Sequence, residues 1–390
     1  MTLEQNHPLH AHATHASRLV RALRGERPET TPVWFMRQAG RSLPEYRELR
    51  VGTKMLDSCF DPAMSSEITM QPVRRHKTDA GIFFSDIVVP LKAVGVDVRI
   101  EPGRGPVFDA PFAAAADIAK LTAIDPAVMD ELGEPIWEGV RRTVAMLHEH
   151  GGTDGAQTTP LIGFAGAPFT LAAYLVEGGP SKDHLGARAL MHTDPAAWQA
   201  LMTWTAEVTG RFLRGQVLAG ASAAQLFDSW AGSLSVRDYA AHVMPASRQA
   251  LTHVRDLSYV IPAGSDGTPS EERAVPTIHF GVGTGEILPL MLEIGVDAIG
   301  VDYRITLDEA ERRLGGGVVL QGNLDPALLA APPAVLEAAV TDVLERGKAA
   351  PAHIFNLGHG VPPGTDPAVL TRIVELVHAV SGTAPAAATA

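Results

Sequence analysis

The stretch GAQTTPLIGFAGAPFTLAAYLV (residues 155–176) is the longest part of the chain without a charged residue. Its length approaches that of a membrane-spanning helix, but Gly163, Gly166 and two prolines interrupt the apolar run. Short apolar runs with breaks of this kind are typical of a buried strand, a loop and the first turns of a helix. We therefore predict a strand over residues 160–164, with a loop and a helix after it.

Seven other runs of the chain have the same character, each four or five residues long and almost wholly apolar. The eight predicted strands are residues 33–36, 80–84, 160–164, 223–227, 276–280, 297–301, 318–321 and 352–355. Half-exposed antiparallel strands should alternate apolar and polar residues, whereas strands covered on both faces should be apolar throughout. The runs therefore predict a buried parallel sheet.

Amphipathic stretches with helical periodicity separate these strands, and the clearest are residues 134–149, 195–218, 236–254, 333–346 and 367–380. Eight strands alternating with helices indicate an α/β protein, a (β/α)8 TIM-type barrel in a single domain. An open, doubly wound sheet is the structural alternative, although no glycine-rich dinucleotide fingerprint follows the first strand.

Three polar stretches lie outside this pattern. Residues 1–16 carry several histidines, residues 382–390 are small and polar, and neither has an apolar face to bury. We expect both to be disordered tails, which leaves the barrel domain over residues 17–381. Residues 263–274 are rich in Gly, Ser, Pro and Glu and are expected to form a surface loop insertion.

The charge balance excludes some classes of partner. The 390-residue chain has 44 Asp and Glu against 32 Lys and Arg, a net charge of −12. Nucleic acids and anionic membrane surfaces select net positive proteins, so neither is an expected partner. The single cysteine, Cys59, excludes internal disulfides and multi-thiolate zinc sites, and the chain has no His-Glu-x-x-His motif, so no metal is expected. With no signal-peptide pattern at the N-terminus, a reducing, cytoplasmic location is expected.

In a barrel, the active site lies where the strands end at their carboxyl side. Polar residues gather directly after the predicted strands, and the candidates are Arg37, Gln38, Arg41, Asp86, Tyr174, Ser229 and His359. Guanidinium groups suit carboxylates and phosphates, and the small residues between Arg37 and Arg41 would let a large ligand approach the backbone. Structural roles remain open: Asp86 and Ser229 as helix caps, Tyr174 as a core aromatic, and His359 as a loop brace.

Several motifs resemble those of the uroporphyrinogen decarboxylase family. The first is PVWFMRQAGRSLPEYR (residues 32–47) and the second is GFAGAPFTLAAYLVEG (residues 163–178). Shorter matches follow in family order: FSDI at 84–87, QLFDSWAG at 225–232, LQGNLDP at 320–326 and FNLGHG at 355–360. Together they cover the chain from about residue 17 to about residue 380.

The resemblance implies a (β/α)8 barrel, usually a homodimer, that needs no metal or organic cofactor. It implies removal of carbon dioxide from the four acetate groups of uroporphyrinogen III to give coproporphyrinogen III, a step in porphyrin biosynthesis. The family's substrate contacts fall on Arg37, Gln38, Arg41, Asp86, Tyr174, Ser229 and His359. Among these, the resemblance makes Asp86, Arg37 and Tyr174 the catalytic candidates. Asp86 would stabilise a protonated pyrrole, and Arg37 is a candidate proton donor.

Three other functions compete with this interpretation. Corrinoid-dependent methyltransferases resemble the family but hold zinc with cysteines, and this chain has one cysteine. A non-catalytic porphyrinogen carrier would be expected to lose some of Arg37, Asp86 and Tyr174, which are intact. A barrel isomerase or aldolase for phosphorylated sugars would need a glycine-rich phosphate loop, for which only residues 358–360 give support.

Overall fold

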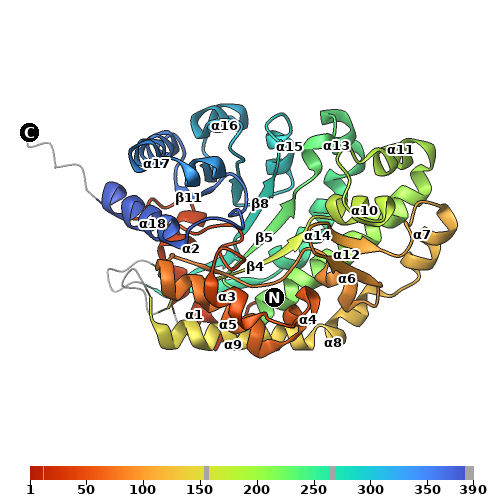
Figure 1. The fold of residues 1–390 in the computed structure, drawn as a ribbon, viewed down its shortest axis with the longest axis horizontal. Coiled ribbons are helices and arrows are strands. Elements are labelled where there is room, and N and C mark those ends of the chain that lie inside the picture. The colour runs from red at the N-terminus through yellow and green to blue at the C-terminus, as the bar shows by residue number, and fades with distance from the viewer. Residues whose placement is uncertain (12, 153–157, 264–268, 383–390) are drawn as a thin grey trace, which may run out of the picture.

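In the computed structural model, which describes residues 1–11, 13–152, 158–263 and 269–382, helices surround a curled parallel sheet (Figure 1). The sheet has seven strands in the order β1-β4-β5-β8-β9-β10-β11. Their bounds are Gly81–Ile82, Leu161–Gly166, Ala223–Asp228, Thr277–Gly281, Ala298–Gly300, Val319–Leu324 and His353–Leu357. Every pair of neighbours is parallel. Since the spatial order never reverses along the chain, the sheet does not have the doubly wound topology.

Seven of the eight predicted strands overlap these observed strands, so the prediction of a parallel sheet is confirmed. The remaining segment, residues 33–36, forms a single parallel bridge from Val33 to Phe355 of β11. The Phe355 N–H donates to the Pro32 carbonyl at 2.8 Å. On the other side of this segment, the Asp79 N–H donates to the Val33 carbonyl at 2.9 Å. The segment therefore lies between β11 and the residues that lead into β1.

The helices alternate with the strands along most of the chain. Those that pack around the sheet and are used below or are longest are α5 (Pro62–His76), α9 (Glu134–His150), α10 (Pro168–Glu177), α11 (Leu185–Thr193), α12 (Pro195–Leu218), α14 (Met244–Arg255), α16 (Leu307–Leu314), α17 (Pro333–Gly347) and α18 (Pro367–Ser381). The other described α-helices are α1 (Pro8–Ala11), α2 (Arg18–Leu23), α3 (Pro44–Leu49), α4 (Met55–Phe60), α6 (Val89–Ala93), α7 (Ala115–Thr122), α8 (Met129–Leu132), α13 (Val236–His242) and α15 (Leu288–Glu293). None of the described helices has the length and apolar character to cross a bilayer.

Asp-Pro pairs set the start of several helices. In α5 the Asp61 carboxylate accepts from the backbone N–H groups of Ala63 and Met64, and Pro62 occupies the first helical position. The pairs at 194–195 and 366–367 start α12 and α18 in the same way. The carboxylate satisfies an N–H group that has no partner within the helix, and proline has no N–H to satisfy. These local signals explain why the predicted helix starts at residues 195 and 367 agree with the structure.

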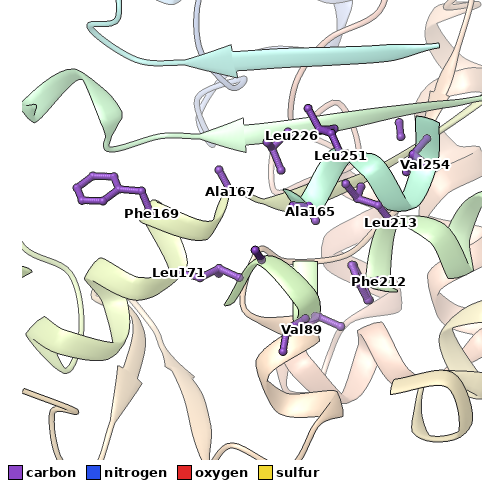
Figure 2. Packing of buried hydrophobic residues seen from close by; sticks show 14 of the residues in the cluster. Val89, Ala165, Ala167, Phe169, Leu171, Phe212, Leu213, Leu226, Leu251 and Val254 are labelled. Carbon is purple, nitrogen blue, oxygen red and sulfur yellow. The ribbon is translucent and has the colours of Figure 1, made fainter. Parts of the chain in front are cut away.

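The outer core lies between the sheet and the helices. Figure 2 shows Ala165 of β4 and Leu226 of β5 facing side chains of α12 and α14. Leu226, Phe212 and Leu251 are fully buried in this layer. The second face of the sheet is equally apolar and includes Trp34, Ile162, Ile278, Val319 and Ile354. Burial on both faces is the reason that the strands are apolar throughout.

A chain of buried hydrogen bonds crosses this second, inward-facing cluster. The Trp34 indole N–H donates to Gln321 Oε1 at 3.1 Å, and Gln321 Nε2 donates to Gln225 Oε1 at 3.0 Å. The three side chains come from the 33–36 segment, β10 and β5, which are not neighbours in the sheet. Because an unpaired polar group inside such a cluster would be costly, these bonds fix the relative position of distant parts of the sheet.

The prediction that residues 1–16 form a disordered tail is wrong for the described residues 1–11 and 13–16. Leu3 and Leu9 are buried, and the Leu3 N–H donates to the Ser258 carbonyl at 2.7 Å. The buried His7 ring bonds the Val217 carbonyl at 2.8 Å, and burial lowers the pKa of His7 to about 4. Two leucines and a neutral histidine anchor a segment whose composition is otherwise polar.

The prediction that residues 263–274 form a surface loop is also wrong in part. A hairpin pairs β6 (Ser258–Ile261) with β7 (Glu271–Ala274), so the last four of those residues are a strand. A second hairpin that was not predicted pairs β2 (Val98–Glu101) with β3 (Gly105–Phe108). The predicted tail from residue 383 onward, and residues 264–268 of the predicted loop, lie outside the described residues.

A substitution at Leu9 tests the packed N-terminal segment. Leu9→Ala is expected to lower the free energy of unfolding by about 3 kcal/mol, because the truncation leaves a cavity beside a fully buried side chain. Val51→Ala is the matched control, since Val51 is 80% exposed and its truncation should change the free energy by no more than about 0.5 kcal/mol. Urea denaturation measures both. Equal values for the two variants would restore the interpretation of residues 1–16 as a tail.

Candidate active site

The predicted site residues lie at the carboxyl edge of the sheet. Arg37 follows the 33–36 segment, Asp86 follows β1, Ser229 follows β5 and His359 follows β11. Tyr174 lies in α10, directly after β4. Because the strands are parallel, all their carboxyl ends meet at this edge. Parts of the chain more than 300 residues apart thus supply one site.

Backbone bonds hold Arg37 beside the loop that carries His359. The Met36 N–H donates to Asn356 Oδ1 at 3.0 Å, and the Val361 N–H donates to the Met36 carbonyl at 2.9 Å. Arg37 adopts a φ of 61°, in the left-handed region. A Cβ atom placed on Gly360 would lie 2.5 Å from Arg37 Cδ, so the arginine stem passes over a position that only glycine leaves open.

Asp86 carries a carboxyl group in surroundings that disfavour its charge. Burial raises the pKa of Asp86, while the Val88 N–H, which donates to Oδ1 at 3.1 Å, and the charge of Arg37 act in the opposite direction. Among the described residues, no cation lies within ion-pair distance of this carboxylate. The Asp86 carboxyl group therefore lacks an ion-pair partner, which a cationic ligand group could supply.

Tyr174 belongs to a stack of three rings. The centroids of the Tyr174 and Trp230 rings are 3.9 Å apart, and the angle between the ring planes is 25°. The third ring is that of His184, whose centroid lies 4.3 Å from that of Trp230. Burial raises the pKa of Tyr174 to about 12; Asp86 adds to the rise and Arg37 opposes it. The phenol therefore keeps its proton near neutral pH and can donate a hydrogen bond. Because both Asp86 and Arg37 act on Tyr174, the three residues form one electrostatic group.

His359 joins the same group through Arg37. Burial lowers the pKa of His359, and Arg37 and then Arg304 lower it further, against the effects of the Gly360 backbone and Asp302. The imidazole is accordingly neutral near pH 7 and offers a hydrogen bond rather than a charge. Arg304 pairs with Asp302 and lies over the Tyr303 ring, 4.7 Å from its centroid.

Arg41 and Ser229 occupy the outer part of the edge. The Arg41 side chain is exposed, and its carbonyl accepts from Arg47 at 2.7 Å, which holds the backbone of the loop. Ser229 is half-buried between Asp228 and Trp230. Arg50, by contrast, is occupied locally, since it donates to the Tyr46 hydroxyl at 2.7 Å and the Thr53 carbonyl at 2.9 Å.

Gln38, predicted as a substrate contact, makes hydrogen bonds inside the protein. The side chain is fully buried; Oε1 accepts from the Phe35 N–H at 3.0 Å, and Nε2 donates to the Ala80 carbonyl at 3.1 Å. Gln38 therefore ties the loop after residues 33–36 to the residue that precedes β1. It braces Arg37 from behind and does not reach the open edge of the sheet.

Sequence reasoning missed three side chains near this edge. Trp230 and Arg304 carried a usable signal, because each lies two positions after an aspartate, Asp228 or Asp302, at or just beyond the end of a strand. His184 carried none, because the loop before α11 has no regular pattern. Its two ring nitrogens are buried with no hydrogen-bond partner among the described residues.

Two cavities formed by the described residues lie away from this group. A cavity of about 490 Å³ lies between α9, α12 and α14 and is lined by Trp137, Arg211 and Arg214, among others. Arg211 pairs there with Asp130 at 2.8 Å, and Arg214 donates to the His253 carbonyl at 2.9 Å. Since these arginines are already occupied and none of the candidate residues lines the cavity, we place the site at the carboxyl edge of the strands.

The fold resembles that of a methyltransferase from Methanosarcina mazei. The TM-score is 0.69 with 17% sequence identity, over 93% of this chain and 98% of that chain. At this identity the likeness concerns the arrangement of helices and strands, and not the reaction.

Comparison of the sequence with known proteins identifies the family, whereas the structural likeness identifies only the fold. The family model for uroporphyrinogen decarboxylase (URO-D) matches residues 14–380. A uroporphyrinogen decarboxylase of Leifsonia xyli subsp. xyli is 67% identical over 377 residues, covering 96% of this chain and 98% of the relative. One from an Arthrobacter species is 59% identical over 94% of this chain and 97% of the relative. The chain therefore belongs to the uroporphyrinogen decarboxylase family.

Proposed function

We propose that this chain is a carboxy-lyase that converts uroporphyrinogen III to coproporphyrinogen III and carbon dioxide. The observation that carries the proposal is the electrostatic group of Arg37, Asp86, Tyr174 and His359 at one edge of the sheet. The group combines a lone carboxylate, a guanidinium and two neutral hydrogen-bonding side chains. It occurs in a chain whose relatives are named uroporphyrinogen decarboxylases.

The proposed reaction needs no metal or organic cofactor, because the pyrrole itself accepts the electrons. A proton adds to the α-carbon of the pyrrole, which becomes cationic. The bond between the acetate methylene and its carboxylate then breaks, carbon dioxide leaves, and the electron pair neutralises the ring. A proton adds to the former methylene carbon to give a methyl group, and the α-proton is released. Each acetate thus consumes one proton and yields one carbon dioxide.

Asp86 would act as a fixed negative charge beside the protonated ring and would accept hydrogen bonds from the pyrrole N–H groups. Arg37 would bind substrate carboxylates and serve as the candidate proton donor. Tyr174, Ser229 and His359 would hydrogen-bond acetate or propionate groups, and Arg41 would bind carboxylates at the rim. Since the chain has a net charge of −12, these arginines are needed to make the site locally positive.

The closed barrel, its domain bounds and the oligomeric state belong to the same proposal. Residues 17–381 would form one (β/α)8 domain, in which the 33–36 segment closes the sheet between β11 and β1. The bonds of this segment to Phe355 and Asp79 support closure. We also propose that the chain is a homodimer, as the resemblance implies, and that it is cytoplasmic. Sedimentation equilibrium of the purified chain tests the dimer, and a monomer at micromolar concentration would exclude it.

An anaerobic assay tests the reaction directly. Purified protein is incubated with chemically reduced uroporphyrinogen III, with and without a metal chelator, and the oxidised products are separated by their number of carboxylates. The expected result is stepwise loss of four carboxylates at the same rate in both conditions. Binding of the porphyrinogen without release of carbon dioxide would instead identify a carrier protein on the same scaffold.

The pH dependence provides a separate prediction. Because burial raises the pKa of Asp86, kcat/KM should decline, as the pH falls, at a higher pH than an ordinary aspartate would cause. Arg37 favours the ionised carboxylate, so in Arg37→Gln the decline should move to still higher pH. His359 should add no decline near its ordinary pKa, since its pKa is lowered. Profiles of kcat/KM for both proteins between about pH 4.5 and 8 check this, and identical acid limbs would contradict it.

A further inference from the structure

We infer that His192, Asp238 and His242 form a binding site for a divalent transition-metal ion of the zinc class. One donor atom from each side chain lies within 4.8 Å of the donor atoms of the other two. The three residues are separate from the candidate active-site residues, and the inference does not depend on the proposed reaction.

Two helices supply the donors. Asp238 and His242 are four residues apart on α13, so they lie on the same face one turn apart. His192 comes from the last turn of α11, and its Nε2 atom lies 3.5 Å from Asp238 Oδ1. The rings of His192 and His242 are 5.4 Å apart and nearly perpendicular. Neither ring stacks flat on the other, so both can point a nitrogen at a shared point.

The donor set selects the class of ion. Two imidazoles and one carboxylate are ligands of zinc, cobalt or nickel, whereas magnesium and calcium require oxygen donors. Three protein ligands leave a fourth position of a tetrahedron for water. Zinc–ligand bonds of about 2.0 Å require donors about 3.3 Å apart, so the observed group must contract slightly. The His192 side chain is 57% exposed and free to turn inward, while Asp238 is 21% exposed.

The backbone under two of the ligands is already held in place. The Ser235 hydroxyl accepts from the Asp238 N–H at 3.0 Å at the start of α13. At the other end of the helix, the Trp198 indole of α12 donates to the His242 carbonyl at 3.1 Å. Preorganised ligands lose less conformational entropy when the ion binds. His192, the most exposed of the three, is the side chain that the metal has to order most.

The position of the site gives it a structural consequence. His184 and Trp230, the other two rings of the Tyr174 stack, lie in the segments that precede α11 and α13. The two helices of the proposed metal site therefore begin shortly after these rings. Figure 1 shows α11, α13 and α10 grouped on one side of the molecule. A metal ion that joins α11 to α13 would stabilise this part of the carboxyl edge without contacting the substrate.

Metal titrations of the purified full chain test the inference. After treatment with a chelator, the protein is titrated by calorimetry with zinc, cobalt and magnesium chlorides. We expect zinc and cobalt to bind one ion at this site with micromolar affinity and magnesium not to bind. Cobalt should give the intense visible absorption of a tetrahedral complex. A saturating excess of zinc should raise Tm by about 4 °C, because the ion binds only the folded chain.

Substitutions of the proposed ligands test whether the ion binds at this group. His192→Gln and His242→Gln should each weaken zinc binding at least about 100-fold and remove the cobalt absorption. His150→Gln is the matched control, since His150 is an exposed helix residue outside the group, and it should behave like the parent chain. The histidines at 7, 10, 12 and 15 remain in every variant. Unchanged zinc affinity and cobalt spectra in both variants, or equal losses in His150→Gln, would overturn the inference. Tm values without metal confirm that the variants fold.

Discussion

Asp86→Asn is expected to lower kcat/KM about a thousandfold, since one fixed charge aimed at a developing charge contributes this much to catalysis. Asparagine has nearly the same shape and retains an oxygen that can accept from the Val88 N–H just before α6. It has no negative charge to stabilise a cationic pyrrole. The loss should therefore appear in the chemical step, in kcat as well as in kcat/KM.

The same substitution should leave the protein as stable as before, or more stable, at pH 7. Burial raises the pKa of Asp86, so the folded state disfavours the ionised carboxyl. A group with a raised pKa contributes stability below its unfolded pKa and loses it as the pH rises through the folded value. Asparagine avoids that loss, and the advantage of the variant should shrink as the pH falls.

Kinetic and thermal unfolding measurements on the same preparation of Asp86→Asn separate the effect on activity from the effect on stability. Asp97→Asn is the control, since that side chain is 82% exposed and lies outside the site. It should change neither kcat/KM nor Tm. An Asp86→Asn protein with full activity would remove the carboxylate from the mechanism. A variant that is both inactive and much less stable would instead assign Asp86 a structural role.

Arg37→Gln is expected to lower kcat/KM at least about a hundredfold, because a charge-assisted contact to a substrate carboxylate is lost. Arg37→Lys should recover only part of the activity, since an ammonium group cannot reproduce the paired hydrogen bonds of a guanidinium. Arg104→Gln is the control, a 63% exposed arginine that pairs with Glu101. Equal activity of Arg37→Gln and Arg104→Gln would contradict the assignment.

The backbone at Arg37 adds a second measurement. Its φ of 61° is unfavourable for a residue with a Cβ atom, and glycine adopts it without that cost. Arg37→Gly should therefore be at least as inactive as Arg37→Gln, with a Tm no lower than that of Arg37→Gln. A Tm clearly lower than that of Arg37→Gln would show that the stem over Gly360 contributes more to stability than the backbone strain removes.

Much of the fold and part of the site could be predicted because they depend on local patterns. Continuous apolar runs marked seven strands, and parallel pairing brings the residues after them to one edge. The 33–36 segment was predicted as a strand, but it forms one bridge instead of a ladder. The N-terminal segment was missed because its partners are distant in sequence: α1 packs against β6, and the His7 ring bonds the Val217 carbonyl of α12.

The role of Gln38 shows why site residues are harder to predict than strands. Its position after a strand is the same as that of Arg37, and both were predicted to contact substrate. The structure turns the Gln38 amide toward the Ala80 carbonyl, 42 residues along the chain, while Arg37 remains exposed. Which of two adjacent polar side chains faces the open edge depends on such distant partners. The position of His184 likewise depends on a partner distant in sequence, Trp230.

The bridge between Val33 and Phe355 also bears on how the chain folds as it is made. The two residues are more than 300 positions apart, so during synthesis at roughly 5 to 20 residues per second the 33–36 segment waits about 15 to 60 s for its partner on β11. Until then one edge of that apolar segment has no strand beside it. An unpaired edge of this kind can join the same edge of another nascent chain. Cells that make this protein in quantity should therefore need a chaperone that covers the N-terminal segment until the ribosome reaches β11.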